Sequence, residues 1–140
     1  MTESTAWFKP LLDAMVEEMK KTGAVTGAAV EATPVWGVPD KLLISRVWGS
    51  SNKSQFIWTI TGENAVTDHI PGSLAATPQE AARHFSFKWQ MDAERLLEVA
   101  KAKSPVADSQ AIIEAHAKKV VQYAESLYDL ASQDDVWKER

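Results

Sequence analysis

The fold is decided between residues 35 and 62, which read VWGVPDKLLISRVWGSSNKSQFIWTITG. Two Val-Trp-Gly triplets, at residues 35–37 and 47–49, are followed by Trp58 in the next apolar run. Aromatic and β-branched residues fit a pleated, half-buried surface. Three of the six tryptophans therefore lie on a predicted small β-meander.

The period of two predicts strands at residues 28–35, 41–48 and 55–61, a turn at 50–54, and a short fourth strand near 65–70. In the second strand the two faces both carry apolar side chains, namely Leu42, Ile44, Arg46 and Trp48 on one face and Leu43, Ser45 and Val47 on the other. A sheet with one solvated face would alternate more cleanly. The second face should therefore be covered by a helix, another subunit or a ligand.

Three helices flank this region. An apolar stripe at helical spacing predicts the first, at about 4–22, with Pro10 either in its first turn or at a kink. Thr77-Pro78-Gln79-Glu80 is a capping box with proline at the first helical position, so a second helix should run from there to about Lys103. The pattern restarts at Ser104-Pro105 and predicts a third helix to about Ala131.

The two long helices have apolar faces of different width. A projection at 100° per residue groups one face of the second helix as Ala81, Ala82, Phe85, Trp89, Ala93, Leu96, Val99 and Ala100. Trp89 is therefore expected in the core. The third helix has a stripe of Ile113, Ala117, Val120, Ala124, Leu127 and Tyr128, widened by Ile112, His116, Tyr123 and Leu130. That width is more than one sheet face requires.

The order of elements indicates an α+β fold: an antiparallel three- to four-stranded meander between an N-terminal helix and two long C-terminal helices. A chain of 140 residues is expected to form one domain, over residues 1–131, followed by a polar tail at 132–140.

Composition limits the classes of function. The chain has no cysteine, which excludes disulfides and thiol chemistry and fits a cytoplasmic protein. Residues 1–5 do not resemble a signal peptide, and no stretch approaches the roughly 18 apolar residues of a membrane helix. Because the net charge is −4, with lysine and arginine scattered, we expect neither nucleic-acid nor membrane binding.

Two polar groups could carry chemistry. Asp68 precedes His69 in a loop and could orient its imidazole for general-base work, although a turn aspartate beside an exposed histidine is the commoner arrangement. On the second helix, Asp92 projects close to the centre of the apolar face, within reach of two cations. This suggests a polar pocket formed by Arg83, His84, Lys88, Asp92 and Arg95, or else a structural ion network. No cofactor motif or metal-ligand spacing is present, so neither is expected.

Three segments in the middle third of the chain stand out: Trp58-x-Ile60-x-Gly62, Thr67-Asp68-His69-Ile70-Pro71, and Pro78-x-Glu80-Ala81-Ala82-Arg83-His84-Phe85-Ser86-x-Lys88-Trp89-Gln90. Together they resemble a small family of uncharacterised proteobacterial proteins of unknown function. The resemblance implies a short, single-domain, cytoplasmic bacterial protein and supplies no activity or catalytic residues. His69 stands where the family has a tyrosine, which weakens a catalytic role for that imidazole.

The sequence therefore favours a non-catalytic interaction or regulatory module that acts as a homodimer or binds another protein. Its interface candidates come from the strands and the third helix: Trp36, Trp48, Trp58, Ile112, His116 and Tyr123. The alternative is a small enzyme with an acid–base site around Asp68, His69, His84 and Asp92.

Overall fold

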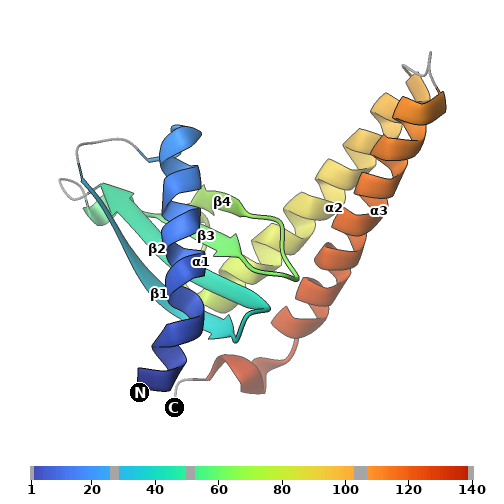
Figure 1. Cartoon of the computed structure of the whole chain (residues 1–140). Coiled ribbons are helices and arrows are strands. Elements are labelled where there is room, and N and C mark those ends of the chain that lie inside the picture. Colours follow the sequence, from blue (N-terminus) through green and yellow to red (C-terminus); the bar gives the residue numbers. More distant parts are fainter. Residues whose placement is uncertain (1, 26–28, 50–52, 103–106, 139–140) are drawn as a thin grey trace. The chain divides into compact units, whose positions relative to one another are not determined.

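A computed structural model describes residues 2–25, 29–49, 53–102 and 107–138. Along the chain it contains helix α1 (Thr2–Lys21), strands β1 (Val30–Val38), β2 (Leu42–Gly49), β3 (Ile57–Thr61) and β4 (Asp68–Pro71), and helices α2 (Pro78–Ala102) and α3 (Ala107–Ala131) (Figure 1). The predicted α+β class and order of elements are confirmed. The start of the first predicted strand, most of the turn at 50–54 and the break at 104–105 lie outside the described residues.

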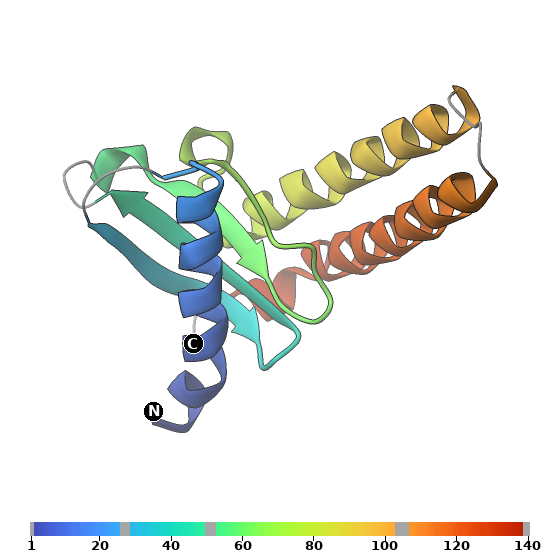
Figure 2. The same ribbon diagram turned by 45° about the horizontal axis from the view of Figure 1, so that its top comes forward.

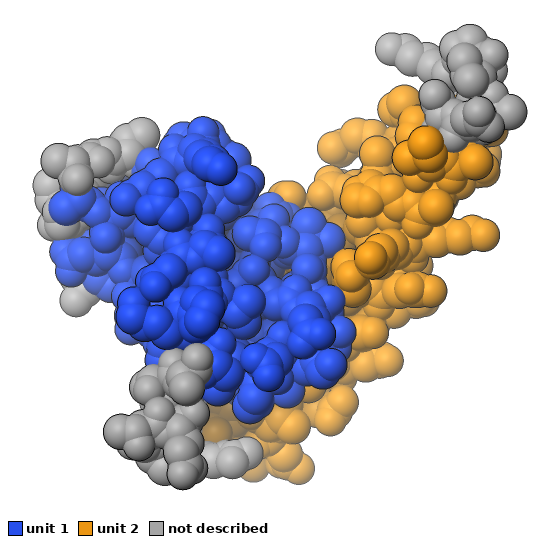
Figure 3. All heavy atoms as spheres, viewed as in Figure 1, with its two compact units in different colours: residues 1–81, 139 blue, residues 82–138, 140 orange. Residues whose placement is uncertain are grey.

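The chain divides into two compact units (Figure 3). Unit 1 contains α1 and the sheet, up to residue 81, and unit 2 begins at residue 82 and contains most of α2 and all of α3. The expectation of a single domain over residues 1–131 stays a prediction.

The sheet of unit 1 is an antiparallel meander in the order β1-β2-β3-β4. β1 is an edge strand, where Pro34 can be accommodated without the N–H that a central strand would need. The register of β1 against β2 shifts between Pro34 and Trp36. This bulge brings Trp36 opposite Ile44 and therefore onto the sheet face that carries Arg46.

One face of the sheet packs against α1, which crosses the strands in both ribbon views (Figures 1 and 2). Met15 and Met19 of α1 form a buried cluster with Val25 and with Val47 of β2. Further apolar side chains pack around this cluster, namely Leu12, Val16, Ala24, Val30, Ala32 and Ile57. The predicted stripe of the first helix thus supplies this core, and Pro10 lies inside the helix.

The opposite face is also apolar and buried. Its buried side chains come from the two central strands and β4: Leu42, Ile44, Trp48, Trp58, Ile60 and Ile70. The Trp58 indole N–H donates a buried hydrogen bond to the Ala75 carbonyl oxygen at 2.9 Å. The chain that follows β4 is therefore tied to this face by a side chain of the central sheet.

The loop after β3 is fixed to the turn between β1 and β2. Asp40 occupies that turn with φ 63°, and the Glu63 and Asn64 amides donate to the carbonyl oxygens of Asp40 and Lys41 at 3.2 and 3.0 Å. Gly62 adopts φ 135°, and a Cβ atom there would collide with the Lys41 backbone. Only glycine fits this close approach of two backbone segments.

The predicted capping box starts α2. The Glu80 amide donates to Thr77 Oγ1 at 3.1 Å, and Glu80 Oε1 accepts a hydrogen bond from the Ala76 amide at 2.8 Å. The carboxylate thus reaches one residue further back than in the usual box. Both hydrogen bonds satisfy amides near the helix start that would otherwise lack partners.

In unit 2, α2 and α3 run side by side in opposite directions (Figures 1 and 2). Buried residues of the two helices include Phe85, Trp89, Ala93 and Ala100 on α2 and Ala117, Val120, Ala124, Leu127 and Ala131 on α3. After α3 a short 3-10 helix, Asp134–Trp137, turns back, and the Trp137 indole N–H donates to the Leu130 carbonyl oxygen at 2.9 Å. The predicted polar tail is thus partly folded.

The glycine constraint can be tested with a matched pair of substitutions. Gly62→Ala should lower the free energy of unfolding by about 3 kcal/mol, because it combines an unfavourable φ with a backbone collision. Gly23→Ala should lower it by only about 1 kcal/mol, since Gly23 has φ 77° but nothing within 4 Å of the added Cβ. Urea denaturation measures both, and equal losses would contradict the packing argument.

Trp89 provides a second test of the fold. Its side chain is fully buried, with its ring centroid 6.0 Å from that of Phe85. Trp89→Ala should lower the free energy of unfolding by about 3–5 kcal/mol through lost burial and a residual cavity. The exposed Val99 on the same helix is the matched control, and Val99→Ala should change stability by about 0.5 kcal/mol or less. A loss below about 1 kcal/mol for Trp89→Ala would contradict its core position.

Candidate functional site

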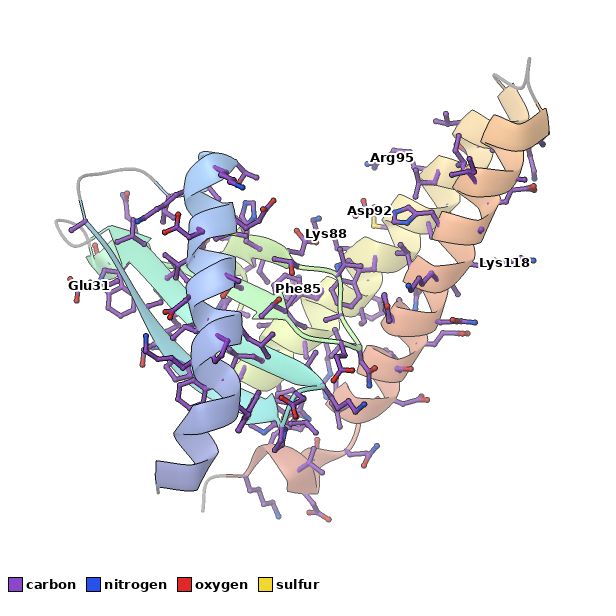
Figure 4. The ribbon with its side chains drawn as sticks, in the orientation of Figure 1. Glu31, Phe85, Lys88, Asp92, Arg95 and Lys118 are labelled. Carbon is purple, nitrogen blue, oxygen red and sulfur yellow. The ribbon has the colours of Figure 1, made fainter. Side chains whose placement is uncertain are left out.

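The polar cluster predicted on α2 exists as an ion network. Lys88 Nζ lies 3.5 Å from Asp92 Oδ2, and Arg95 Nη1 lies 3.8 Å from Asp92 Oδ1. Figure 4 shows the three side chains following one another along α2. The Asp92 side chain is 39% exposed, so water screens both pairs.

This placement differs from the helical projection, which put Asp92 near the centre of the apolar face. In the structure Asp92 lies at the border of that face, while the buried positions are Phe85, Trp89 and Ala93. Arg83 and His84 are exposed, and neither forms an ion pair with Asp92 in the described part of the chain. Three of the five predicted pocket residues are brought together, and they form a surface network.

The predicted Asp68–His69 pair lies in unit 1 and does not have the geometry of an acid–base dyad. Asp68 Oδ1 accepts a hydrogen bond from the backbone amide of His69 at 2.8 Å. Neighbouring residues of a strand point to opposite faces, and here Asp68 is opposite Ile60 whereas His69 is opposite Thr59. The carboxylate therefore orients the backbone.

His69 lines an open cavity of about 420 Å³ at one end of the sheet, together with Ala24, Ser54, Gln55, Phe56, Ile57, Pro71, Gly72 and Ser73. Among these described lining residues, His69 is the only histidine, and no aspartate or glutamate is present. An acid–base site would need a second acid or base, and the described lining of this cavity does not contribute one.

The interface candidates differ in their accessibility. Trp58 is fully buried and hydrogen-bonded, so it is a core residue of unit 1. Trp48 is also buried, and Trp36 is partly exposed. On α3, Ile112 is 70% exposed and His116 is exposed, while Tyr123 is partly exposed with Lys119 Nζ 5.9 Å from its ring centroid. The side chains that widen the apolar arc of α3 are therefore largely exposed to solvent.

A second apolar surface of unit 2 was missed by the sequence reasoning. Phe87 and Met91 of α2 and Tyr128 of α3 are 50%, 59% and 43% exposed, and the Phe87 and Tyr128 rings lie 5.9 Å apart between centroids. We name these three residues the Phe87 patch. Its signal in the sequence is the i,i+4 spacing of Phe87 and Met91 outside the projected stripe of α2.

The residues that the structure describes form neither a metal-binding cluster nor a membrane-spanning helix. Over residues 2–25, 29–49, 53–102 and 107–138, no three His, Asp or Glu side chains gather in a way that could hold a metal ion. Within the same ranges, no helix has both the length and the apolar character needed to span a membrane.

Comparison with known protein families places these features in one context. The model of a family described as "Domain of unknown function (DUF4826)" matches residues 3–137. The match confirms the predicted relation to an uncharacterised family and extends it beyond the middle third of the chain. No curated protein and no solved structure matches the sequence.

The exposure of the Asp92 network predicts weak coupling between its members. A double-mutant cycle that combines Asp92→Asn with Arg95→Gln, and a second that combines it with Lys88→Gln, should each give a coupling energy of about 0.3–0.5 kcal/mol. Added salt should reduce it further. Thermal or urea unfolding provides the measurement, and coupling of about 3 kcal/mol would show that the network is buried after all.

Proposed function

We propose that this chain, which belongs to the DUF4826 family, is a non-catalytic protein-interaction module that acts as a homodimer. The observation that carries the proposal is the exposure of the Phe87 patch on unit 2. Soluble monomers show few clustered, exposed aromatic side chains, and such clusters commonly mark protein interfaces. The absence of cysteine agrees with action in a reducing compartment such as the cytoplasm.

The composition of the patch supports an interface. Aromatic residues and methionine are enriched in interface cores, where their large side chains lose contact with water. A methionine sulfur also makes favourable contacts with aromatic rings. Phe87 and Met91 are one turn apart on α2, so the two residue types are already adjacent on one ridge.

The ridge suits a second copy of the same chain. In a two-fold dimer, a residue that contacts a given position in the partner is contacted in return by the equivalent residue. Suppose that α2 packs antiparallel to α2 of a second copy, with the two-fold axis at the height of residue 89 along the helix but on the exposed side. Phe87 then faces Met91 of the second copy. The same axis places Met91 against Phe87 of the second copy, so one contact is made twice.

Charges at the ends of the ridge are complementary in the same arrangement. Arg83 lies one turn before Phe87, and Glu94 lies nearly one turn after Met91, and both side chains are exposed. The axis beside residue 89 brings Arg83 close to Glu94 of the second copy. Opposite charges at the rim of an interface favour this pairing and disfavour a shifted register.

The same observations give less support to the enzyme alternative. The Asp68 carboxylate accepts a hydrogen bond from a backbone amide, and the Asp92 carboxylate is paired with two cations at the surface. His84 is exposed on α2. A general base needs a partner that orients it and a cleft that holds a substrate, and neither is formed by these groups within their own units.

Self-association can be measured directly. Light scattering coupled to size exclusion, at micromolar concentration, should give about twice the 15.5 kDa mass of one chain. Met91→Lys places a charge in the proposed interface and should weaken the dimer by at least about tenfold, because a buried charge without a partner is costly. Phe87→Ser should act in the same direction.

The matched control is Val99, which is exposed on the same helix but lies outside the Phe87 patch. Val99→Lys should leave the dissociation constant unchanged. Ile112→Lys tests the other exposed surface of unit 2 in the same way. A monomeric wild-type protein would refute the proposal, and a dimer disrupted by Ile112→Lys but not by Met91→Lys would refute the assigned interface.

A further inference from the structure

Arg46 occupies an unusual position on the sheet of unit 1. Its guanidinium carbon lies 4.9 Å from the centroid of the Phe56 ring and 4.8 Å from that of the Trp58 ring. The two rings are 5.5 Å apart between centroids and stand at 81° to each other. The cation is therefore held in a corner of two aromatic walls, where cation–π attraction fixes its position.

Strand pairing creates this corner. Arg46 of β2 is directly opposite Trp58 of β3, and on its other side it is directly opposite Thr33 of β1. Side chains opposite each other in an antiparallel pair are close enough to contact. The position of the cation thus follows from the register of the central strands, which both sheet faces depend on.

Among the residues that the structure describes, none acts as a counter-ion for the Arg46 guanidinium. Arg46 Nε is buried and has no hydrogen-bond partner, and no carboxylate of the described residues forms an ion pair with Arg46. Glu31 is the nearest acidic residue by register, since it is opposite Trp48, but it is exposed and is not paired with Arg46. A buried donor without an acceptor costs about 1–3 kcal/mol, so the position of Arg46 is unfavourable by itself.

A cavity opens beside this cation. It measures about 220 Å³ and is lined by Thr33, Arg46, Trp48 and Phe56. The lining combines one guanidinium, one hydroxyl and two aromatic side chains, all from unit 1. An apolar wall with a few polar groups that converge on one point is the usual make-up of a small-molecule site.

We propose that this cavity binds the carboxylate of a small organic acid that carries a flat apolar group. Guanidinium donors match the two oxygens of a carboxylate in a bidentate arrangement. A single cation suits a monoanion, whereas a phosphate dianion would call for a second cationic group, which the described lining does not contain. The aromatic side chains contact the apolar part of the ligand, and the small volume limits its size.

Benzoate is a suitable probe for this site. In a nitrogen-15 correlation spectrum, its titration should shift the signals of the Trp48 indole N–H and the Arg46 Nε–H in a saturable manner. Benzamide has the same shape but no charge, and it should shift them far less. Arg46→Gln should weaken benzoate binding by about tenfold or more, because it removes a charge-assisted hydrogen bond. Arg46→Lys should weaken binding to a smaller extent.

Arg95→Gln is the matched control, since it removes the same charge from an exposed site in unit 2 and should leave the titration unchanged. If Arg46→Gln fails to fold, Thr33→Leu decides: Thr33 is exposed, and a larger apolar side chain there should block the cavity without removing the cation. Retained benzoate binding in Thr33→Leu would overturn the proposal.

Three further outcomes would also overturn it. Equal shifts with benzoate and benzamide would mean that the cavity recognises only a flat ring. Saturable shifts with inorganic phosphate but not with benzoate would change the ligand class. No saturable shift with any of these probes would leave the Arg46 stack purely structural. The titration is independent of the proposed dimer, because the Phe87→Ser and Met91→Lys variants should bind benzoate as the wild type does.

Discussion

Strand β2 has no solvated face, and unit 1 is organised around this constraint. Every residue from Leu42 to Trp48 is buried except Arg46, which is partly buried. Because neighbouring residues of a strand point to opposite faces, both faces of the sheet need a cover. On one face α1 supplies Met15 and Met19. On the other face, the Trp58 indole N–H donates a hydrogen bond to the Ala75 carbonyl oxygen, which ties the chain after β4 to the sheet.

Arg46 is the only charged residue of β2, a strand whose two faces are both covered. A cation in a strand that buries both faces loses much of its hydration, and such a loss is tolerable only when other contacts replace the water. Here the replacement is two aromatic rings, since no carboxylate of the described chain is paired with Arg46. Rings attract the cation but accept few hydrogen bonds, so the guanidinium donors keep their capacity to bind an anion.

The sequence predicted the elements well because their signals are local. The capping box at Thr77 and the stripe of α1 each depend on residues within one helix, and both are present in the structure. The site was less predictable. Asp92 lies at the border of the buried face because a uniform 100° projection gives the direction of each residue, but not how wide the buried sector of the helix is. The Arg46 corner requires the register of β2 against β3, which sequence spacing alone does not specify.

Unit 2 buries small and large side chains together. Alanine recurs among the buried residues, at Ala93, Ala100, Ala117, Ala124 and Ala131. Phe87, Met91 and Tyr128 are outside the buried set and remain at the surface, where they add nothing to the core. Their burial against a second copy would stabilise the dimer by removing apolar area from water, at about 25 cal/mol per Å² before the losses of association.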